Sequence, residues 1–148
     1  TMMFGTVETD EEIIEHWELL RNLQDKTGGF RAFIMWSFQG ANTQLKAEIP
    51  DIKPQSSNRY LRLLAVARLY LDNFKNMQSS WVTQGSYVGQ LALKFGANDL
   101  GSTMMEENVV KAAGASNRMN QEEMIRLIKD IGETPAKRNT AYEILERF

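Results

Sequence analysis

The chain has 148 residues, of which 43% are hydrophobic and 24% charged, a balance that fits one soluble globular domain with a substantial core. Its net charge of -2 gives no electrostatic reason to expect a nucleic acid or an anionic membrane as partner, and no apolar run approaches the roughly 20 residues of a membrane-spanning helix. The sequence has no cysteine and one histidine, His16, which excludes disulfides, thiolate metal sites and histidine-rich metal sites within this chain.

The amino-terminal third of the sequence predicts two buried strands separated by a helix. Residues 1–8 have the apolar character of a short strand and lack the basic and long apolar segments of a signal peptide, so we expect a cytoplasmic protein. Thr9-x-x-Glu12 has the pattern of a capping box, which begins a helix, and Gly28-Gly29 ends it. Phe30–Trp36 is a glycine-bounded apolar run, as expected for a parallel strand covered on both faces.

The middle of the chain predicts a long irregular segment, a helix and a third strand. Residues 37–57 show no convincing periodicity, and loops of this length in compact domains are usually functional or disordered. A helix with a broad apolar face begins near Ser57, and Ser80–Gln84 is predicted as the third strand. A further helix then runs from Gly85 to Phe95.

The last third predicts one more strand, two helices and a tail. Ala97–Asp99 is predicted as the fourth strand, and Thr103-x-x-Glu106 caps the helix that follows and ends at Gly114. Asn120-x-x-Glu123 begins another helix, which ends at Gly132 and turns Met124, Leu127, Ile128 and Ile131 inward. The tail is basic and then amphipathic, and its basic residues are expected on a solvated face: Lys137, Arg138 and Arg147.

This order of four strand–helix units with short buried strands predicts an α/β fold with parallel strands. Four such units make half of a (β/α)8 barrel of the TIM type, and the abrupt first strand suggests a boundary inside a larger fold. We therefore expect a single partial domain over residues 1–148, with the four units in 1–132 and a C-terminal extension in 133–148. The edges and inner face of a half barrel lack partners, so we expect a homodimer or a swapped assembly to cover them.

The ends of the four predicted strands are polar or rich in glycine, and in β/α barrels such ends carry the chemistry. They are Gly5-Thr6-Val7-Glu8, Trp36-Ser37-Phe38-Gln39, Thr83-Gln84-Gly85 and Asn98-Asp99-Leu100-Gly101-Ser102. Strand ends are generally polar because loops follow them, but four that meet at one rim favour a ligand site. Asp99 and Glu8 are the carboxylates expected to face this site, with stabilisation of a helix N-terminus as the alternative role of Glu8.

Four segments of the chain have a more specific pattern. The first combines Gly96–Ser102 with Met105-Glu106-Glu107-Asn108 and Ala112-Ala113-Gly114, and the others are Phe33–Thr43, Ser80–Gly85 and Pro135–Tyr142. Together they resemble a group of radical S-adenosylmethionine enzymes that make menaquinone precursors of the futalosine pathway and the deazaflavin chromophore. Within this group Trp36-x-Phe38-Gln39 looks most like the enzymes that cyclise dehypoxanthine futalosine, and aminofutalosine and deazaflavin synthases are the alternatives.

The resemblance implies S-adenosylmethionine as a cofactor and residues that would contact it. Thr1-x-Met3-x-Gly5-x-x-Glu8 is in register with a G-x-I-x-G-x-x-E-like motif on the fifth barrel strand of these enzymes. Met3 is therefore expected near the adenine, with Gly5 and Glu8 supporting the turn, and the backbone from Ile34 to Trp36 would flank the adenine. Related enzymes often have histidine where this chain has Thr6, which puts any proton-transfer role at this position in doubt.

The resemblance also implies what this chain lacks. Enzymes of the group hold a [4Fe-4S] cluster through a C-x-x-x-C-x-x-C loop after the first barrel strand, and this chain has no cysteine. The chain thus looks like the carboxy-terminal half of the barrel, strands five to eight, which alone would bind no cluster and be inactive.

The expected partners are the missing amino-terminal half and a small nucleoside-type substrate, with no catalytic residue assigned. A free-standing, non-catalytic binding module is the alternative class. Residues expected to face the substrate are Trp36, Gln39, Thr83, Gln84, Asn98, Asp99 and Ser102.

Overall fold

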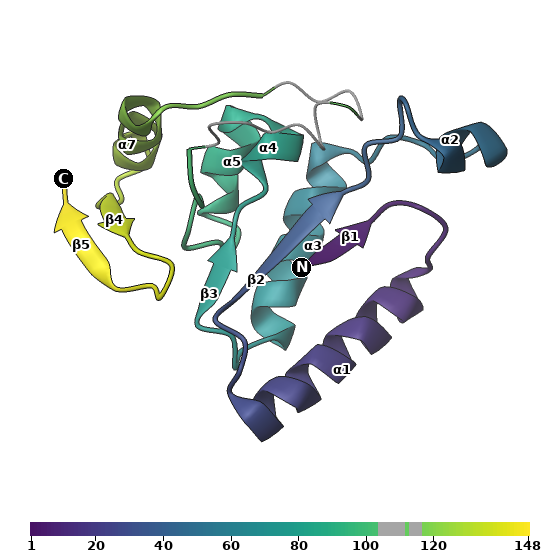
Figure 1. The fold of residues 1–148 in the computed structure, drawn as a ribbon, viewed down its shortest axis with the longest axis horizontal. Helices are drawn as coiled ribbons and strands as arrows, with labels where there is room; N and C mark the ends of the chain where they lie inside the picture. The colour runs from purple at the N-terminus through teal and green to yellow at the C-terminus, as the bar shows by residue number, and fades with distance from the viewer. Residues whose placement is uncertain (104–111, 113–116) are drawn as a thin grey trace.

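The computed structural model describes residues 1–103, 112 and 117–148 (Figure 1). Its main sheet has three parallel strands in the order β1-β2-β3, with bounds Met2–Phe4, Ala32–Ser37 and Asn76–Gln78. Residues 97–99 continue this order, because Asp99 forms a parallel bridge with Gln78. The α/β class and the parallel strands expected from the sequence are confirmed.

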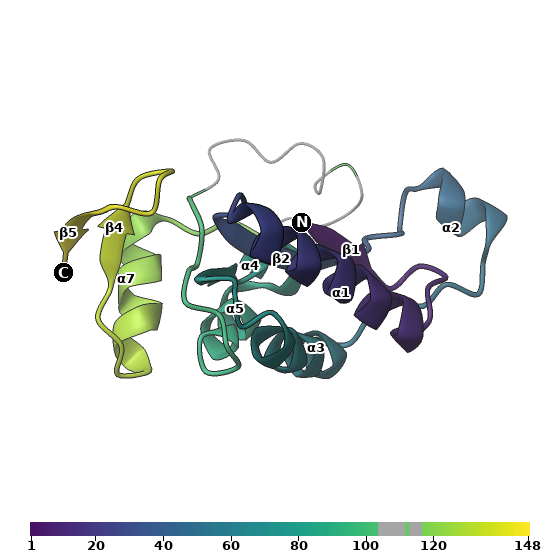
Figure 2. The ribbon, with the colours of Figure 1, turned by 90° about the horizontal axis from the view of Figure 1, so that it is seen from below.

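Three helices pack on one face of this sheet: α1 (Asp10–Thr27), α3 (Ser57–Tyr70) and α5 (Ser86–Ala92). Their buried residues form one core with alternate residues of the strands, namely Met2, Phe4, Phe33, Met35 and Met77. Figure 2 shows α3 below the strands, on the side away from the turn of the C-terminal hairpin. None of the helices in the described part of the chain is long and apolar enough to cross a membrane.

The remaining helices lie outside this core. Among the described residues they are α2 (Gln44–Glu48), α4 (Trp81–Gln84) and α7 (Gln121–Asp130). α7 buries Met124 and Leu127 in a second core, with Ile128 partly buried against it, as predicted from their spacing. Trp81 of α4, Leu100 and Met119 belong to the same second core.

Side-chain caps hold the helix ends that the sequence predicts. The Thr9 hydroxyl accepts from the Glu12 N–H at 3.2 Å, and the Glu12 carboxylate accepts from the Thr9 N–H at 2.7 Å, which is the reciprocal pair of a capping box. Gly28 ends α1 in the left-handed region at φ 58°. Asn120 caps α7 by accepting from the Glu123 N–H at 2.8 Å.

The opposite face of the sheet carries a different set of residues. Because side chains alternate along a strand, the residues between the core residues point away from the helices. Met3 pairs in register with Trp36, and Ile34 pairs with Gln78. Met3 is 44% exposed, and the other three side chains are half-buried. We call the surface of these four residues the open face. Parallel sheets normally have both faces covered, whereas among the described residues the helical core covers only the other face of this sheet.

The prediction for the third strand is wrong. β3 precedes the predicted segment, and Trp81–Gln84 forms the helix α4. β3 offers one buried apolar residue, Met77, between two amides, which is too short a pattern to show alternation. Trp81 is 1% exposed because it packs in the second core rather than in the sheet.

Other boundaries differ by smaller amounts. The first strand ends at Phe4, whereas the sequence predicts a strand over residues 1–8. Residues 97–99 form a single bridge to β3 rather than a full strand. The irregular segment 37–57 contains the short helix α2. The helix expected from Thr103 to Gly114 lies almost entirely outside the described residues.

The C-terminal extension forms an antiparallel hairpin of β4 (Ala136–Arg138) and β5 (Ile144–Arg147). Figure 1 shows this hairpin beside α7, with its turn directed toward the start of β3. Arg31, the residue before β2, donates from Nη1 to the Thr140 carbonyl at 3.3 Å, which ties the turn to the amino-terminal end of the sheet.

Candidate functional site

The turn after β1 is organised around the carboxylate of Glu8. This carboxylate accepts from the Gly5 N–H, from the Thr6 N–H at 2.9 Å and from the Thr6 hydroxyl at 2.6 Å. Burial opposes ionisation of Glu8, but these hydrogen bonds outweigh it and hold the pKa of the carboxyl below its ordinary value. Gly5 has φ 90°, and a Cβ there would overlap Gln55, so only glycine suits this position. The turn thus has the support that the resemblance assigns to Gly5 and Glu8.

The three apolar positions expected near the adenine lie together. Met3 and Trp36 are cross-strand partners, and Ile34 lies two residues before Trp36 on the same face of β2. All three therefore belong to the open face. An apolar surface of this kind suits packing against the ring of a nucleoside, and the binding of a cofactor by these three residues stays a prediction.

Two amides meet a buried hydroxyl at the carboxyl end of β2. The Ser37 side chain is almost fully buried, and its Oγ accepts from Gln84 Nε2 at 2.6 Å and from Gln39 Nε2 at 3.1 Å. The structure therefore brings together Gln39 and Gln84, which were predicted to bind substrate from two different strand ends. Thr83 lies beside them in sequence but hydrogen-bonds to Ser80, with 2.8 Å between the two hydroxyl oxygens. Ser37 was not among the predicted site residues, although its place between Trp36 and Gln39 was a signal.

Asn98 is placed away from this cluster. Its Oδ1 accepts from the Met77 N–H at 2.8 Å and from Arg68 Nη2 at 3.2 Å, and its Nδ2 donates to the Lys75 carbonyl at 3.1 Å. These bonds extend the pairing of residues 97–99 with β3. The structure thus gives Asn98 a structural set of partners, and its contact with a substrate stays a prediction.

Asp99 has the most connected carboxylate among the described residues. Oδ1 accepts from the Gly101 N–H at 3.0 Å and from Arg138 Nε at 3.1 Å, and Oδ2 accepts from Arg138 Nη2 at 2.5 Å and from the Tyr142 hydroxyl at 3.0 Å. The Arg138 guanidinium also lies 3.9 Å from the centre of the Tyr142 ring. The expectation that Arg138 lies on a solvated face is wrong, because its side chain is only 24% exposed. The resemblance of Pro135–Tyr142 to the radical S-adenosylmethionine group was the one feature of the sequence that pointed to a role for Arg138.

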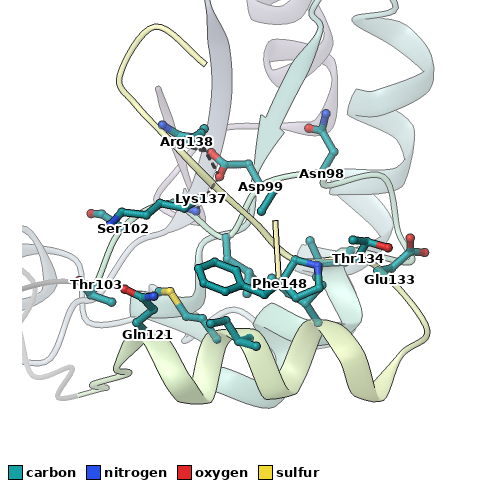
Figure 3. A pocket seen from close by; sticks show the side chains of 18 of the residues that line it. Asn98, Asp99, Ser102, Thr103, Gln121, Glu133, Thr134, Lys137, Arg138 and Phe148 are labelled. Carbon is teal, nitrogen blue, oxygen red and sulfur yellow. Dashed lines mark hydrogen bonds and ion pairs between the residues drawn. The ribbon is translucent and has the colours of Figure 1, made fainter. Parts of the chain in front are cut away.

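A cavity of about 830 Å³ lies next to this ion pair, between residues 97–103, α7 and the C-terminal hairpin. Figure 3 shows Arg138 joined to Asp99 on one side of the cavity, α7 on the other, and the ring of Phe148 between them. Asn98, Asp99 and Ser102, all predicted to face a substrate, line this cavity. Gln39 and Gln84 do not, so the predicted substrate residues fall into two groups rather than one rim.

The resemblance implies two cofactors, and the residues of this chain fit S-adenosylmethionine in part but do not fit an iron–sulfur cluster. The open face offers apolar surface to a nucleoside such as S-adenosylmethionine. An iron–sulfur cluster needs thiolates, and the sequence has none. Among residues 1–103, 112 and 117–148, no group of three histidine, cysteine or acidic side chains is arranged to hold a metal ion.

A parallel sheet with helices on one face, an apolar open face and polar strand ends defines an α/β domain with a candidate ligand site. Residues 27–148 match the family model described as the CofH/MqnC C-terminal region. The chain belongs to this family.

Curated relatives extend the comparison over the whole chain. It is 50% identical over 145 residues to the cyclic dehypoxanthine futalosine synthase of Streptomyces coelicolor and 46% identical over 148 residues to that of Halalkalibacterium halodurans. A 5-amino-6-(D-ribitylamino)uracil–L-tyrosine 4-hydroxyphenyl transferase of Methanococcus maripaludis is 41% identical over 150 residues. These matches cover 98%, 100% and 99% of this chain but 35%, 39% and 42% of the relatives. The chain thus spans well under half the length of the proteins it resembles.

Proposed function

We propose that this chain is the carboxy-terminal part of a radical S-adenosylmethionine enzyme that converts dehypoxanthine futalosine to cyclic dehypoxanthine futalosine in menaquinone biosynthesis. The observation that carries the proposal is the 46–50% identity over nearly the whole chain to cyclic dehypoxanthine futalosine synthases. The open face supports it, because a half barrel exposes its inner wall and a full barrel would enclose the substrate there.

In the proposed enzyme this chain binds and orients, while the cluster ligands come from the rest of the protein. S-adenosylmethionine, when bound and reduced by the cluster, supplies the radical chemistry. Met3, Ile34 and Trp36 pack against its adenine and exclude water, and the Glu8 carboxylate keeps the turn at Gly5 in place beside them.

The substrate side of the proposed site is polar. Gln39 and Gln84 are oriented by their common bond to Ser37 and hydrogen-bond to the nucleoside, with Thr83 next to them. Ser102 contributes from the end of the last barrel strand, where Asp99 lines the same cavity with its carboxylate held by Arg138 and Tyr142, and Asn98 holds that strand against β3. The isolated chain is inactive in this proposal because it carries no cluster cysteines.

The open face and the two sheet edges that pair with no other described strand would be covered by a partner in the proposed enzyme. We propose that the amino-terminal half of the barrel is that partner, and that the chain on its own forms a homodimer or a swapped assembly. Light scattering across a range of concentrations checks the second statement, and a monomer at every concentration would refute it.

The test uses the full-length protein with its cluster reconstituted. We expect turnover of dehypoxanthine futalosine with production of 5′-deoxyadenosine, and Trp36→Ala should weaken both turnover and S-adenosylmethionine binding by roughly tenfold or more. Tyr87→Ala is the matched control, because Tyr87 is 71% exposed on α5 and outside the site. Absence of turnover with tight cofactor binding would reject the substrate but keep the enzyme class.

A tyrosine 4-hydroxyphenyl transferase is the second candidate, because the 41% identity to the Methanococcus maripaludis enzyme also covers nearly the whole chain. Supplying tyrosine and 5-amino-6-(D-ribitylamino)uracil to the same preparation separates the two activities. Turnover of this pair and not of dehypoxanthine futalosine would select the transferase. A protein that binds a nucleoside and turns over neither substrate would be the binding module.

A further inference from the structure

The C-terminal hairpin is attached to the sheet on the side of the open face. Asp99 pairs with Gln78, and Gln78 pairs with Ile34, so the three side chains point to the same side of the sheet. The core residue Met77 points to the other side. The carboxylate of Asp99 therefore emerges on the face that is free of the helical core, and Arg138 and Tyr142 meet it there.

All the acceptor positions of Asp99 are in use. A carboxylate offers about four lone-pair sites, and Asp99 receives four hydrogen bonds, of which three come from the hairpin residues Arg138 and Tyr142. No acceptor position is left for a hydroxyl or amine of a substrate while the hairpin is in place. Direct contact between Asp99 and a substrate would require one of these bonds to break.

This ion pair differs from the other ion pairs of the described residues in its burial. The Asp99 and Arg138 side chains are 10% and 24% exposed, whereas both side chains of each other pair are at least 37% exposed. Surface pairs contribute little because water screens them, and a partly buried bidentate pair contributes more. The pair is thus suited to holding the hairpin in one position.

The turn of the hairpin is built to present Tyr142. Asn139 Oδ1 accepts from the N–H groups of Ala141 at 2.9 Å and Glu143 at 3.0 Å, and Asn139 Nδ2 donates to the Glu143 carboxylate at 2.6 Å. Tyr142 itself has φ 66°, a left-handed conformation that costs a non-glycine residue free energy. The surrounding bonds of Asn139 and the contacts to Asp99 and Arg138 hold it there.

We infer that the C-terminal hairpin is the floor of the ligand chamber on the open face, and that Asp99 is a positioning residue that holds Arg138 and Tyr142 on this floor. The inference rests on the proposed function, in which the open face is the inner wall of a barrel. Arg138, anchored through Nε and Nη2, is then the charged group of the floor, and the bond from Arg31 to Thr140 fixes the floor at the amino-terminal end of the sheet.

The test compares Asp99→Asn with Tyr142→Phe in the full-length protein. Asp99→Asn removes the charge and turns one acceptor into a donor, so trypsin should cleave the hairpin at Lys137 and Arg138 roughly tenfold faster. Tyr142→Phe removes one bond and should accelerate cleavage roughly two- to threefold. The double variant should match Asp99→Asn, because the two changes act on one contact. Asp130→Asn is the matched control, because it breaks the exposed Arg126–Asp130 pair on α7 and should change nothing.

Steady-state kinetics separate positioning from substrate contact. If Asp99 acts through the hairpin, Asp99→Asn should raise KM several-fold, with kcat within about twofold of the original value and Tyr142→Phe showing a smaller rise in KM. Unchanged cleavage of the hairpin in Asp99→Asn would overturn the inference, and so would a higher KM without faster cleavage, which would place Asp99 on the substrate. If Asp99→Asn does not fold, the rates for Tyr142→Phe decide. If the unaltered protein turns over no substrate, the proposed function fails, while the cleavage rates still test the hairpin.

Discussion

Gly5 directly follows β1, in the turn that the Glu8 carboxylate holds. Its replacement by alanine tests how much this turn contributes to the stability of the fold. The residue has φ 90°, and an added Cβ would overlap Gln55 Cγ and lie 2.7 Å from Gln55 Cδ. Two separate penalties are therefore combined at one position: backbone strain and steric overlap. Gly28 separates them, because it also has a positive φ, 58°, but a Cβ there would meet nothing within 4 Å.

The magnitudes follow from these two geometries. A left-handed alanine costs about 1–2 kcal/mol, so Gly28→Ala should lower the free energy of unfolding by about 1 kcal/mol. Gly5→Ala adds overpacking of about 1–3 kcal/mol, which gives a total loss of about 2–5 kcal/mol. Gln55→Ala removes the obstructing side chain, so the double variant Gly5→Ala/Gln55→Ala should recover most of the overpacking and keep the backbone strain.

Urea denaturation of Gly28→Ala, Gly5→Ala, Gln55→Ala and the double variant measures these differences, with the fluorescence of the buried Trp17 and Trp81 as the signal of unfolding. The expected order of stability is Gly28→Ala, then the double variant, then Gly5→Ala. The reasoning would be refuted if Gly5→Ala lost no more stability than Gly28→Ala, or if removing the Gln55 side chain gave no recovery.

Three further predictions concern single side chains. The pKa of Glu8 is lowered in the folded protein, so its stabilising effect is present above the ordinary value of 4.5 and is lost as pH falls through the folded value. Glu8→Gln should therefore flatten the acid side of the stability–pH curve, measured as Tm against pH, and an unaltered slope would contradict this. Burial, then the charge and hydrogen bond of Asp99, raise the pKa of Tyr142 to about 12. Its stabilising effect is present below the ordinary value of 10 and is lost as pH rises through about 12, so Tyr142→Phe should remove that loss from the alkaline side of the same curve. Asn98→Ala leaves the Met77 N–H without its acceptor and should lower the free energy of unfolding by about 1 kcal/mol, whereas Asn98→Asp keeps an acceptor there and should cost less in the same urea assay.

The helices of this fold could be predicted from the sequence because the patterns that mark their ends and faces are local. The Thr9 capping box, the glycine at position 28 and the apolar spacing of α7 each act within a few residues, and all appear where expected. β2 was accessible because its six residues are bounded by polar and glycine-rich segments. β3 could not be predicted, because three residues with one buried side chain show no periodicity, whereas the more apolar Trp81-Val82 nearby has the character of a strand.

The sequence predicts which residues lie at the candidate site, but it does not predict the contacts that they make. The sequence places Gln39 and Gln84 at strand ends, but nothing in it shows that both amides donate to Ser37, since the two are far apart in the chain. Asp99 appears in the sequence as a free carboxylate at a strand end. Its partner Arg138 lies 39 residues later, in a tail whose basic residues are typical of a solvated face. Long-range ion pairs of this kind leave no spacing pattern, so the sequence offers no local signal for them.

The two faces of the sheet are covered unequally, and this difference bears on the proposed place of the chain in a barrel. One face buries Phe33 and Met35 of β2 under helices, which satisfies the hydrophobic effect on that side. The other face leaves Met3 44% exposed and Trp36 only half-buried, while β1 and residues 97–99 each have an edge that pairs with no other strand of the described residues. Apolar area left in water forgoes about 25 cal/mol per Å², and free parallel edges leave backbone groups for a further strand to bond. In the proposed barrel the same strands, added to the edges of this sheet, would remove both deficits by closing the sheet over the open face. The hairpin, fixed to Asp99 on that face, would then be the floor of the chamber that these strands enclose.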